Sequence, residues 1–412
     1  MNILSINKYY WRKGGSESVF FNEMELLEEA GHTVVPFSMA SDKNEETPHS
    51  RFFVDEVDYD KGGVANKLSS AAKIIYSFDA KSKMKTLLKE KAFDLAHFHI
   101  FQHQISTSVF GPLRDKKIPI ILTLHDLKPI CPSYKYYVNG SVCEMCVGGK
   151  FYNCFKNRCT KGSALGSLVN TVEMYFHSAM GYYKNVDRYI AVSHFYKKKM
   201  VEAGFPESQV SYLPNYIDAS MYDPEAEDKG YMLYFGRLSE EKGVSTFLDS
   251  ALENSDIPYL IVGTGPLEEA LKAKAAKDKI SNVTFLGFKQ GEELKKLISE
   301  STCVVVPSEW YENCPMTILE AFASGRPVIG ARIGGIPELI NDTVDGLVFE
   351  PGDAKSLSSK VKWIWERRGE AKEMGAAARS KVESNFNREI HYKGLQAIYD
   401  EVLGVSPVEK GR

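Results

Sequence analysis

Residues 306–346 decide the fold, and they read VPSEWYENCPMTILEAFASGRPVIGARIGGIPELINDTVDG. The three valines at 304–306 come directly before Pro307, and such a short β-branched run predicts a buried strand. After a loop, Pro315 suits the first position of a helix, which continues through 316–323 and ends at Gly325. The unpaired amides and the positive dipole end at the start of that helix predict an anion site.

Two glutamates accompany this anion site. Glu312 lies in the loop and Glu320 lies two helical turns later, which gives a Glu-x7-Glu spacing. Carboxylates accept paired hydrogen bonds from hydroxyls, so two acids here suit a ligand that carries both hydroxyls and phosphate. The alternative is an ordinary solvated helix face. The site is favoured by three neighbouring motifs, which are Pro-Ser-Glu at 307–309, Gly-Gly-Ile-Pro-Glu at 334–338 and Asp-Gly at 345–346.

The stretch resembles the signature of retaining glycosyltransferases of family 4. The resemblance implies an α/β GT-B fold, with two facing Rossmann-like domains, parallel sheets and a C-terminal helix that crosses back to the first domain. It also implies that Glu312 holds hydroxyls of the donor sugar and that Glu320 holds the ribose of the nucleotide. Further donor contacts are then expected around the helix start, at Cys314, Met316 and Thr317.

A pair of cations precedes this stretch. The strand expected at 231–235 delivers Arg237, and Lys242 begins the next helix. A guanidinium fork and an ammonium group together suit a pyrophosphate better than either alone, although two surface cations would also fit the pattern. In the family the corresponding positions bind the donor diphosphate, so the resemblance assigns both a catalytic role and implies metal-independent chemistry.

Two later strands add donor-binding candidates. The strand and glycine turn at 259–265 contain Gly263, but Glu268 stands where a third glycine would complete a dinucleotide fingerprint. That departure counts against a dehydrogenase. The turn after the strand at 283–287 contains Phe288 and Lys289, where the family holds the nucleobase.

The N-terminal half supplies its own candidates. A strand at 3–6 leads to Gly14 and Gly15 and a helix over 16–30, and glycines there let backbone amides approach a phosphate closely. A glycine pair is also an ordinary turn. The buried strand at 118–124 delivers His125 at the sheet edge where ligands bind, and in the family a histidine there faces the donor sugar.

Two more histidines lie on the strand expected at 94–100. His97 and His99 point to the same face of that strand. We expect structural or cleft-lining roles for them, since no third metal ligand is evident at suitable spacing. A polar, irregular segment at 41–63 and a basic helix at about 67–89 precede this strand.

An insertion at 131–159 carries five of the seven cysteines. Cys143 and Cys146 have metal-knuckle spacing, and Cys154 with Cys159 could complete a structural zinc site, for which Cys131 is a possible substitute. The alternative is that the thiols are merely buried or idle. A cysteine-rich insertion in this place resembles that of some bacterial surface-polysaccharide glycosyltransferases.

Charge is uneven although the net charge is only −3. Residues 101–200 hold 14 lysines and arginines against 5 acidic residues, together with 15 phenylalanines and tyrosines. An amphipathic helix at about 163–184 lies in this segment, and its apolar side fits a protein core better than a membrane surface. No apolar run reaches the roughly 18–20 residues of a membrane span, and the first residues lack a signal peptide, so we expect a cytoplasmic location, peripheral on the inner face of the plasma membrane.

These observations predict three segments: an acceptor-side domain at 1–218, a nucleotide-sugar domain at 219–386 and a returning helix at 387–412. The function expected is retaining transfer of a hexosyl or N-acetylhexosaminyl group from a nucleotide sugar, with UDP preferred, to a lipid-linked saccharide in bacterial exopolysaccharide, capsule or O-antigen assembly. An anionic membrane surface is an expected partner, and nucleic acid is not. Two alternatives remain open, which are a nucleotide-sugar epimerase or hydrolase of the same fold and a catalytically dead binding subunit.

Overall fold

The computed structural model describes residues 1–57 and 64–405, which form two compact units. The first unit comprises Met1–Tyr136, Glu144–Leu213 and Tyr392–Arg412, and the second comprises Tyr137–Cys143 and Pro214–His391. The units therefore divide at 213/214 and 391/392, whereas the sequence placed the boundaries at 218 and 387. Residues 58–63 of the irregular segment and 406–412 of the returning segment lie outside the described residues.

The first unit is built on a six-stranded parallel sheet in the order β2-β1-β3-β4-β7-β8. Its strands are β1 (Asn2–Ile6), β2 (Thr33–Phe37), β3 (Leu95–Phe98), β4 (Ile120–Leu124), β7 (Arg188–Ala191) and β8 (Val210–Tyr212). Its helices are α1 (Gly15–Glu29), α2 (Val64–Ile75), α3 (Phe78–Glu90), α4 (Phe110–Asp115), α5 (Tyr152–Lys156), α6 (Ala164–Ala179) and α7 (His194–Glu202). β3 and β4 are buried along their whole length, as central parallel strands covered on both faces should be.

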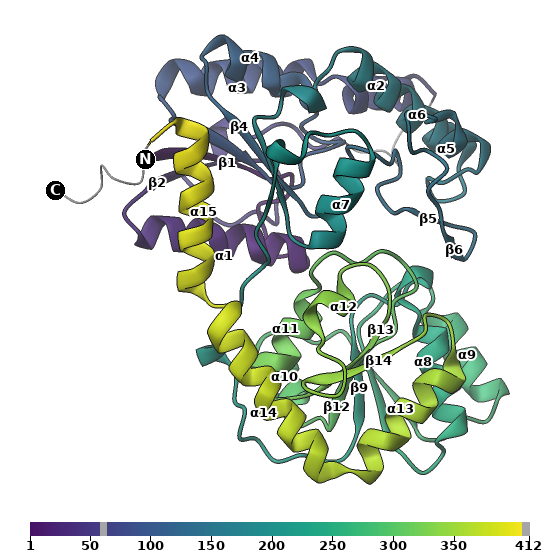
Figure 1. Ribbon diagram of the computed structural model, residues 1–412. Coiled ribbons are helices and arrows are strands. Elements are labelled where there is room, and N and C mark those ends of the chain that lie inside the picture. Colours follow the sequence, from purple (N-terminus) through teal and green to yellow (C-terminus); the bar gives the residue numbers. More distant parts are fainter. Residues whose placement is uncertain (58–63, 406–412) are drawn as a thin grey trace. The chain divides into compact units, whose positions relative to one another are not determined.

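The last helix, α15 (Arg388–Leu403), packs in the core of the first unit (Figure 1). Leu395 and Tyr399 are fully buried there, in one cluster with Ile3 of β1, Phe20 of α1 and Ile121 of β4. The C-terminal helix therefore contributes to the same hydrophobic core as the first strand, which is the crossing that the resemblance implied.

The second unit has another six-stranded parallel sheet, in the order β11-β10-β9-β12-β13-β14. Its strands are β9 (Met232–Phe235), β10 (Tyr259–Val262), β11 (Val283–Gly287), β12 (Cys303–Val306), β13 (Val328–Ala331) and β14 (Gly346–Phe349). Its helices are α8 (Val244–Glu253), α9 (Glu268–Lys277), α10 (Gly291–Ser299), α11 (Met316–Ala323), α12 (Ile336–Leu339), α13 (Ala354–Glu366) and α14 (Arg368–Asn385). A small antiparallel hairpin, β5 (Tyr137–Val138) with β6 (Ser141–Val142), also clusters with this unit.

The single basic helix predicted at 67–89 is wrong, because the chain forms α2 and α3 there. The break comes at Ser77, whose extended backbone ends the helical run and whose hydroxyl accepts a hydrogen bond from the Ala80 amide. A serine in that position is a favourable helix N-cap, so it starts a new helix rather than continuing the old one.

The burial of α6 is also opposite to the core packing that the sequence favoured. Four of its large apolar side chains are exposed, with exposed fractions of 56% for Leu165, 42% for Leu168, 45% for Val172 and 43% for Tyr175, whereas Met174 is buried. Five of its polar side chains are buried instead, and these are Ser167, Asn170, Thr171, Glu173 and His177. The reason is that the buried polar groups have partners within the first unit, which removes the usual penalty for burying them.

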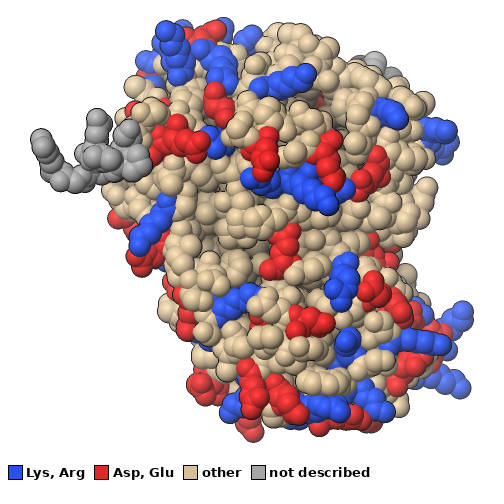
Figure 2. Space-filling view, viewed as in Figure 1, with Lys and Arg blue, Asp and Glu red and all other residues tan. Residues whose placement is uncertain are grey.

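Surface charge is mixed on the face drawn in Figure 2. Basic and acidic side chains lie among one another on that face, without a broad field of one sign. Elsewhere in the chain, Lys272 pairs with Glu268 within α9, and Lys289, just before α10, pairs with Glu293 of α10. The excess of lysine and arginine counted over residues 101–200 therefore does not make this face of the protein positively charged as a whole.

Candidate active site

The candidate residues of the second unit lie where its parallel strands end. β9 leads to Arg237, β10 to Gly263, and β12 to the loop that contains Glu312. The carboxyl ends of parallel strands meet at one edge of a sheet, so these positions share the edge where α/β proteins bind ligands. Arg237 is exposed, and its carbonyl accepts a hydrogen bond from the buried Tyr234 hydroxyl at 2.8 Å, which fixes the turn after β9.

The centre of the site is an ion pair between Lys242 and Glu312. The Lys242 Nζ lies 2.6 Å from Glu312 Oε1, and their side chains are 27% and 6% exposed. The Ser308 hydroxyl donates a second hydrogen bond to the same oxygen at 2.7 Å. Burial by itself would raise the pKa of Glu312, but Lys242 and these hydrogen bonds lower it below its ordinary value. Glu312 is therefore a carboxylate, able to accept hydrogen bonds from hydroxyls.

Two glycines allow the backbone to pack tightly around this pair. Gly334 has a φ of +60°, and a Cβ there would lie 2.4 Å from the Glu312 carbonyl oxygen. Gly243 has a φ of +65°, and a Cβ there would lie 1.8 Å from the Pro307 carbonyl oxygen. Both the conformation and the contact exclude other residues. The Gly335 amide then donates to the Glu312 carbonyl at 2.8 Å, so the glycine run at 334–335 anchors the acidic loop.

The start of α11 lies next to Glu312 in the chain. Pro315 is the N-cap rather than the first helical residue, with an extended ψ of 120°. Cys314 is buried, and its carbonyl accepts a hydrogen bond from the Asn215 amide group at 2.9 Å. Met316 and Thr317, which open the helix, are partly exposed. The first amides of α11 are thus held in place at the same sheet edge, where they can bind an anion.

Glu320 lies on α11 in a different environment from Glu312. Its neighbours are the Tyr222 hydroxyl, which hydrogen-bonds to it, and Lys295. Burial raises the pKa of Glu320 to about 7, against the smaller lowering effects of these two groups. The two acids of the Glu-x7-Glu pattern therefore differ, since one is firmly ionised and the other is near its midpoint at neutral pH.

The remaining donor-binding candidates of this unit lie at the ends of β10 and β11. Gly263 donates its amide to the Gly287 carbonyl at 2.7 Å, and a Cβ on Gly263 would lie 1.9 Å from the Gly236 carbonyl oxygen. Phe288 is 63% exposed, which leaves its ring available to stack on a flat group. Lys289 is paired with Glu293 on α10.

In the first unit, Gly14 and Gly15 open α1. Gly14 is the N-cap in an extended conformation, and neither glycine has a positive φ. The backbone conformation alone therefore does not require glycine at these positions. Without side chains they leave the first amides of α1 uncovered, as an anion contact would need.

His125 follows β4 and contacts another histidine. Its Nε2 lies 2.9 Å from Nδ1 of His99, and the two rings are stacked with centroids 5.2 Å apart. Burial, and then the neighbouring His99, lower the pKa of His125 to about 3. His125 is therefore a neutral imidazole that can donate or accept hydrogen bonds but carries no charge at neutral pH.

The cysteines of the insertion are all reduced. A hydrogen bond from Cys159 is the main cause that lowers the pKa of Cys154 to about 7. Cys143 belongs to the hairpin that clusters with the second unit, whereas Cys146 belongs to the first. Among the side chains that the structure describes, at residues 1–57 and 70–405, the group compact enough to hold a metal is Glu23, His97 and His99, without a cysteine. The cysteine zinc site stays a prediction.

Several residues of the site were not found from the sequence. Ser308 and Tyr222 bind the two acids, and Glu23 joins His97 and His99. Glu23 carried a usable signal, because it interrupts the buried apolar face of α1 between Phe20 and Leu27. A charged residue in such a position needs a partner.

Comparisons with known proteins identify the family. Residues 13–221 match the family model described as Glycosyltransferase Family 4, and residues 222–381 match Glycosyl transferases group 1. The amylovoran biosynthesis glycosyltransferase AmsK of Erwinia amylovora is 28% identical over 227 residues, which cover 52% of this chain and 56% of AmsK.

Two solved structures show the fold. Sucrose-phosphate synthase from Thermosynechococcus elongatus superposes with a TM-score of 0.75 at 20% identity, covering 98% of this chain and 100% of that one. Anabaena HepE in complex with UDP and glucose gives a TM-score of 0.67 at 16% identity, covering 97% and 100%. With its two parallel-sheet units and these matched segments, the chain belongs to glycosyltransferase family 4 and has the GT-B fold.

Proposed function

We propose that this glycosyltransferase moves a hexosyl or N-acetylhexosaminyl group from a nucleoside-diphosphate sugar to a saccharide acceptor, with retention at the anomeric carbon. The observation that carries the proposal is the Lys242–Glu312 pair at 2.6 Å beside the start of α11. An ionised carboxylate accepts sugar hydroxyls, while the adjacent ammonium and the helix amides neutralise a phosphate. A nucleotide sugar needs both functions next to each other.

In the proposed reaction, the bond between the anomeric carbon and the β-phosphate oxygen breaks, and the acceptor oxygen bonds to the same carbon from the same side. The acceptor proton passes to the departing phosphate. Arg237, Lys242 and the first amides of α11 take up the charge of the leaving diphosphate, while Glu312 and His125 orient the sugar and Glu320 binds the ribose. The protein contributes positioning and charge stabilisation, and two cations with the helix amides make a metal unnecessary for the leaving group.

A panel of labelled nucleotide sugars tests the reaction. Transfer predicts release of nucleoside diphosphate that depends on a saccharide acceptor, and NMR of the product should show the anomeric configuration of the donor. An epimerase would convert the donor without releasing diphosphate, and a hydrolase would release it equally without acceptor. A dead binding subunit would bind the nucleotide and release nothing.

We propose a uridine nucleotide. HepE, which shares the fold, is described in complex with UDP and glucose. Phe288 and Lys289 lie after β11, where an exposed ring and a long cation can contact a base. Calorimetric titration with UDP, GDP and ADP decides this, and tighter binding of GDP or ADP would replace the proposal.

We further propose that the acceptor is attached to a lipid and that α5 and α6 dock the first unit on an anionic membrane surface during assembly of a surface polysaccharide. Leu165, Leu168 and Val172 of α6 form one exposed apolar stripe, because their spacing places them on the same helix face. The stripe extends to α5, where the amide of the exposed Tyr152 donates to the Tyr175 hydroxyl at 3.3 Å.

The cations next to this apolar stripe favour an anionic membrane surface as its binding partner. Lys150, Lys156, Arg158 and Lys161 are all exposed in the segment that precedes α6. Each cation near an anionic leaflet contributes about 1 kcal/mol, and apolar side chains add insertion energy. Across residues 1–57 and 64–405, no helix is both long and apolar enough to cross a membrane. AmsK, the relative named for amylovoran biosynthesis, motivates the choice of polysaccharide assembly.

Cosedimentation with vesicles tests this docking surface. Binding should require phosphatidylglycerol, fall as salt rises, and weaken at least several-fold in the variant Leu168→Ser/Val172→Ser. The matched control is Leu252→Ser on α8, which removes an equally exposed leucine (50%) from the second unit and should leave binding unchanged. Binding that ignores lipid charge, or that both variants weaken equally, would favour a soluble acceptor.

A further inference from the structure

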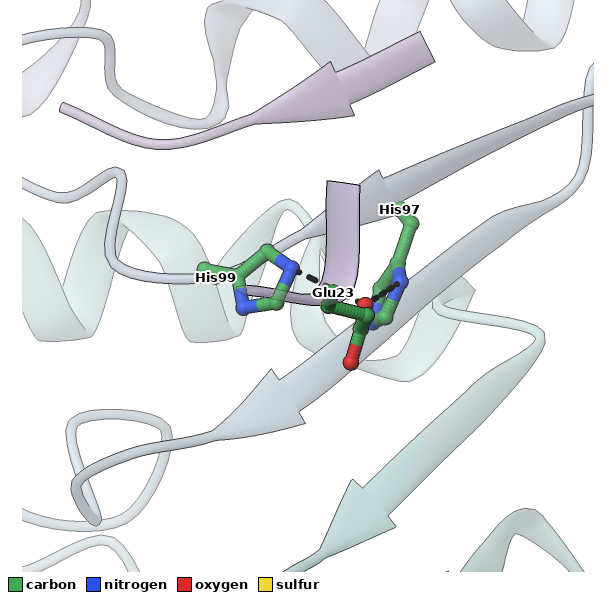
Figure 3. A group of neighbouring side chains, drawn as sticks. All are labelled: Glu23, His97 and His99. Carbon is green, nitrogen blue, oxygen red and sulfur yellow. Dashed lines mark ion pairs between the residues drawn. The ribbon is translucent and has the colours of Figure 1, made fainter. Parts of the chain in front are cut away.

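Three buried side chains of the first unit gather at one point. They are Glu23 of α1, His97 of β3 and His99, which directly follows β3. Their exposed fractions are 3%, 1% and 1%. The ligand atoms that they offer lie within 4.8 Å of one another, and Figure 3 shows the Glu23 carboxylate facing both imidazole rings. The sequence offered no third metal ligand at a suitable spacing from the two histidines, and the fold supplies one from a helix much earlier in the chain.

The distances suit ligands that share one metal ion. Glu23 Oε1 is 2.9 Å from His97 Nδ1 and 3.3 Å from His99 Nε2. Two ligands bonded to one zinc ion at about 2.0–2.1 Å, with tetrahedral angles, lie about 3.3–3.4 Å apart. The contact with His99 has that separation, which exceeds the roughly 2.7–3.2 Å of ordinary N–H···O hydrogen bonds. The contact with His97 would have to lengthen by roughly 0.4 Å to admit the ion.

A fourth donor comes from the C-terminal helix. The hydroxyl of Tyr399 on α15 lies 2.7 Å from His97 Nδ1, which is the nitrogen that faces Glu23. Tyr399 is fully buried. Two imidazoles, one carboxylate and one tyrosine oxygen give the four donors that a structural zinc site uses. Imidazole ligands also favour zinc over magnesium or calcium, which take oxygen ligands.

The other nitrogens of the two histidines are arranged as they are in metal sites. A histidine that binds a metal through one nitrogen usually makes a hydrogen bond through the other, which fixes the orientation of the ring. His97 Nε2 lies 2.8 Å from the Thr123 hydroxyl, and His99 Nδ1 lies 2.9 Å from His125 Nε2. Each ring is therefore oriented with its remaining nitrogen toward Glu23.

The charge of Glu23 also favours a metal ion at this place. A carboxylate buried to this degree is stable when a cation or a metal compensates its charge. The imidazoles that face Glu23 are cationic only when they are protonated, whereas a divalent ion keeps its charge at every pH. An ion bound here would neutralise the carboxylate without protonating either ring.

We propose that these four side chains, Glu23, His97, His99 and Tyr399, bind one structural zinc ion. Each of them is at most 3% exposed, so the ion is closed off from substrates, as structural zinc ions are. It ties α1 and the end of β3 to α15, which packs in the hydrophobic core of the first unit. This site is separate from the one predicted at the cysteines, and it does not depend on the proposed transfer reaction.

Counting zinc in full-length protein purified without a histidine tag tests the site. The wild type should contain one equivalent of zinc more than Glu23→Gln, whatever the cysteines hold. Loss of an outer partner of a metal ligand lowers metal affinity by about 10- to 100-fold, and loss of the ligand itself should lower it by more. The matched control is Glu17→Gln, which changes another buried glutamate of α1, 4% exposed, and should keep the zinc content of the wild type.

Hydrogen exchange measures what the ion does for the fold. Free zinc at 100 times its Kd should slow exchange through unfolding by about 100-fold in peptides from α1 and α15, and it should have no such effect in Glu23→Gln. Equal zinc content in the wild type and Glu23→Gln, or an equal loss in Glu17→Gln, would overturn the proposal.

Anomalous diffraction at the zinc edge decides the question without a variant, which matters if Glu23→Gln does not fold. Crystals of the wild-type protein grown with zinc should show an anomalous peak among the four side chains. A map with a peak at the cysteines alone, or with no peak, would show that Glu23 is neutralised by a protonated imidazole instead.

Discussion

Replacing Lys242 by Met separates the two contributions of the Lys242–Glu312 pair. Met is similar in length and apolar, so the substitution removes the charge with little change in volume. The Glu312 side chain, 6% exposed, then lacks its cation. The hydrogen bond from the Ser308 hydroxyl at 2.7 Å remains on Oε1. A buried carboxylate without its cation is strongly unfavourable, and this predicts a loss of stability as well as of activity.

The magnitude follows from the burial of the pair. Removing one partner of a fully buried ion pair costs about 3–5 kcal/mol, and because Lys242 is about a quarter exposed we expect a smaller loss of about 2–3 kcal/mol in the free energy of unfolding. Adding Glu312→Gln removes the uncompensated charge, so the double variant should recover about 1–2 kcal/mol of that loss. The barrier to transfer should rise by about 2–4 kcal/mol in the Lys242→Met enzyme, as on loss of one oxyanion donor. That increase lowers kcat/KM by about 30- to 900-fold.

Urea unfolding followed by tryptophan fluorescence provides the stability measurement. Three of the four tryptophans, at positions 310, 363 and 365, belong to the second unit, so the signal mainly reports on the unit that contains the pair. The control is Lys272→Met, which removes an exposed cation from α9 and should change neither stability nor turnover appreciably. A double variant no more stable than Lys242→Met, or wild-type turnover in Lys242→Met, would refute the reasoning.

Four further predictions concern charge, nucleotide binding, pH and metal. Arg237→Ala should raise the barrier to transfer by about 2–4 kcal/mol because it removes one cation from the leaving diphosphate; unchanged steady-state kinetics would contradict the assignment. Glu320→Ala should weaken nucleotide binding in a calorimetric titration. Burial raises the pKa of Glu320 from 4.5 to about 7, so the wild-type free energy of unfolding should fall as pH rises across this range, because the folded state keeps a proton that the unfolded chain has released. Glu320→Gln should flatten that slope in urea unfolding, and an unchanged slope would rule out this origin. If Cys143, Cys146, Cys154 and Cys159 hold zinc, protein purified without a histidine tag should contain about one zinc per chain and loosen on chelation; no metal with five reactive thiols would count against it.

The second unit could be predicted closely because its signals are local. The strand at 283–287 and the helix at 316–323 match β11 and α11 residue for residue. In each case an apolar run is bounded by Gly, Pro or a polar turn, so the boundaries are marked in the sequence itself. The resemblance assigned Lys242 and Glu312 to different parts of the donor, and the structure shows that their side chains form an ion pair at 2.6 Å.

The contacts of Glu23 with His97 and His99 could not be predicted in the same way. His97 and His99 were expected on one strand face, and both contact Glu23. Glu23 comes from α1, far earlier in the chain, and nothing in a single sequence states which helix residue lies above which strand residue. The missing step was to require a partner for every charge on an apolar helix face, which would have marked Glu23 as buried and paired.

α6 shows why periodicity alone does not decide which side of a helix is buried. Its sequence has an apolar stripe and a polar stripe, and the hydrophobic effect alone would bury the apolar one. The polar stripe is buried because its groups are satisfied there: Glu173 pairs with the buried Lys128 at 2.6 Å, and Asn170 donates to the Thr160 hydroxyl at 2.9 Å. Burial would raise the pKa of Glu173, but Lys128 and His103 lower it to about 2, so the pair stays charged. Once these bonds hold the polar face of α6 against the first unit, Leu165, Leu168 and Val172 on the opposite face must point outward. Their exposure follows from the polar network rather than from weak packing.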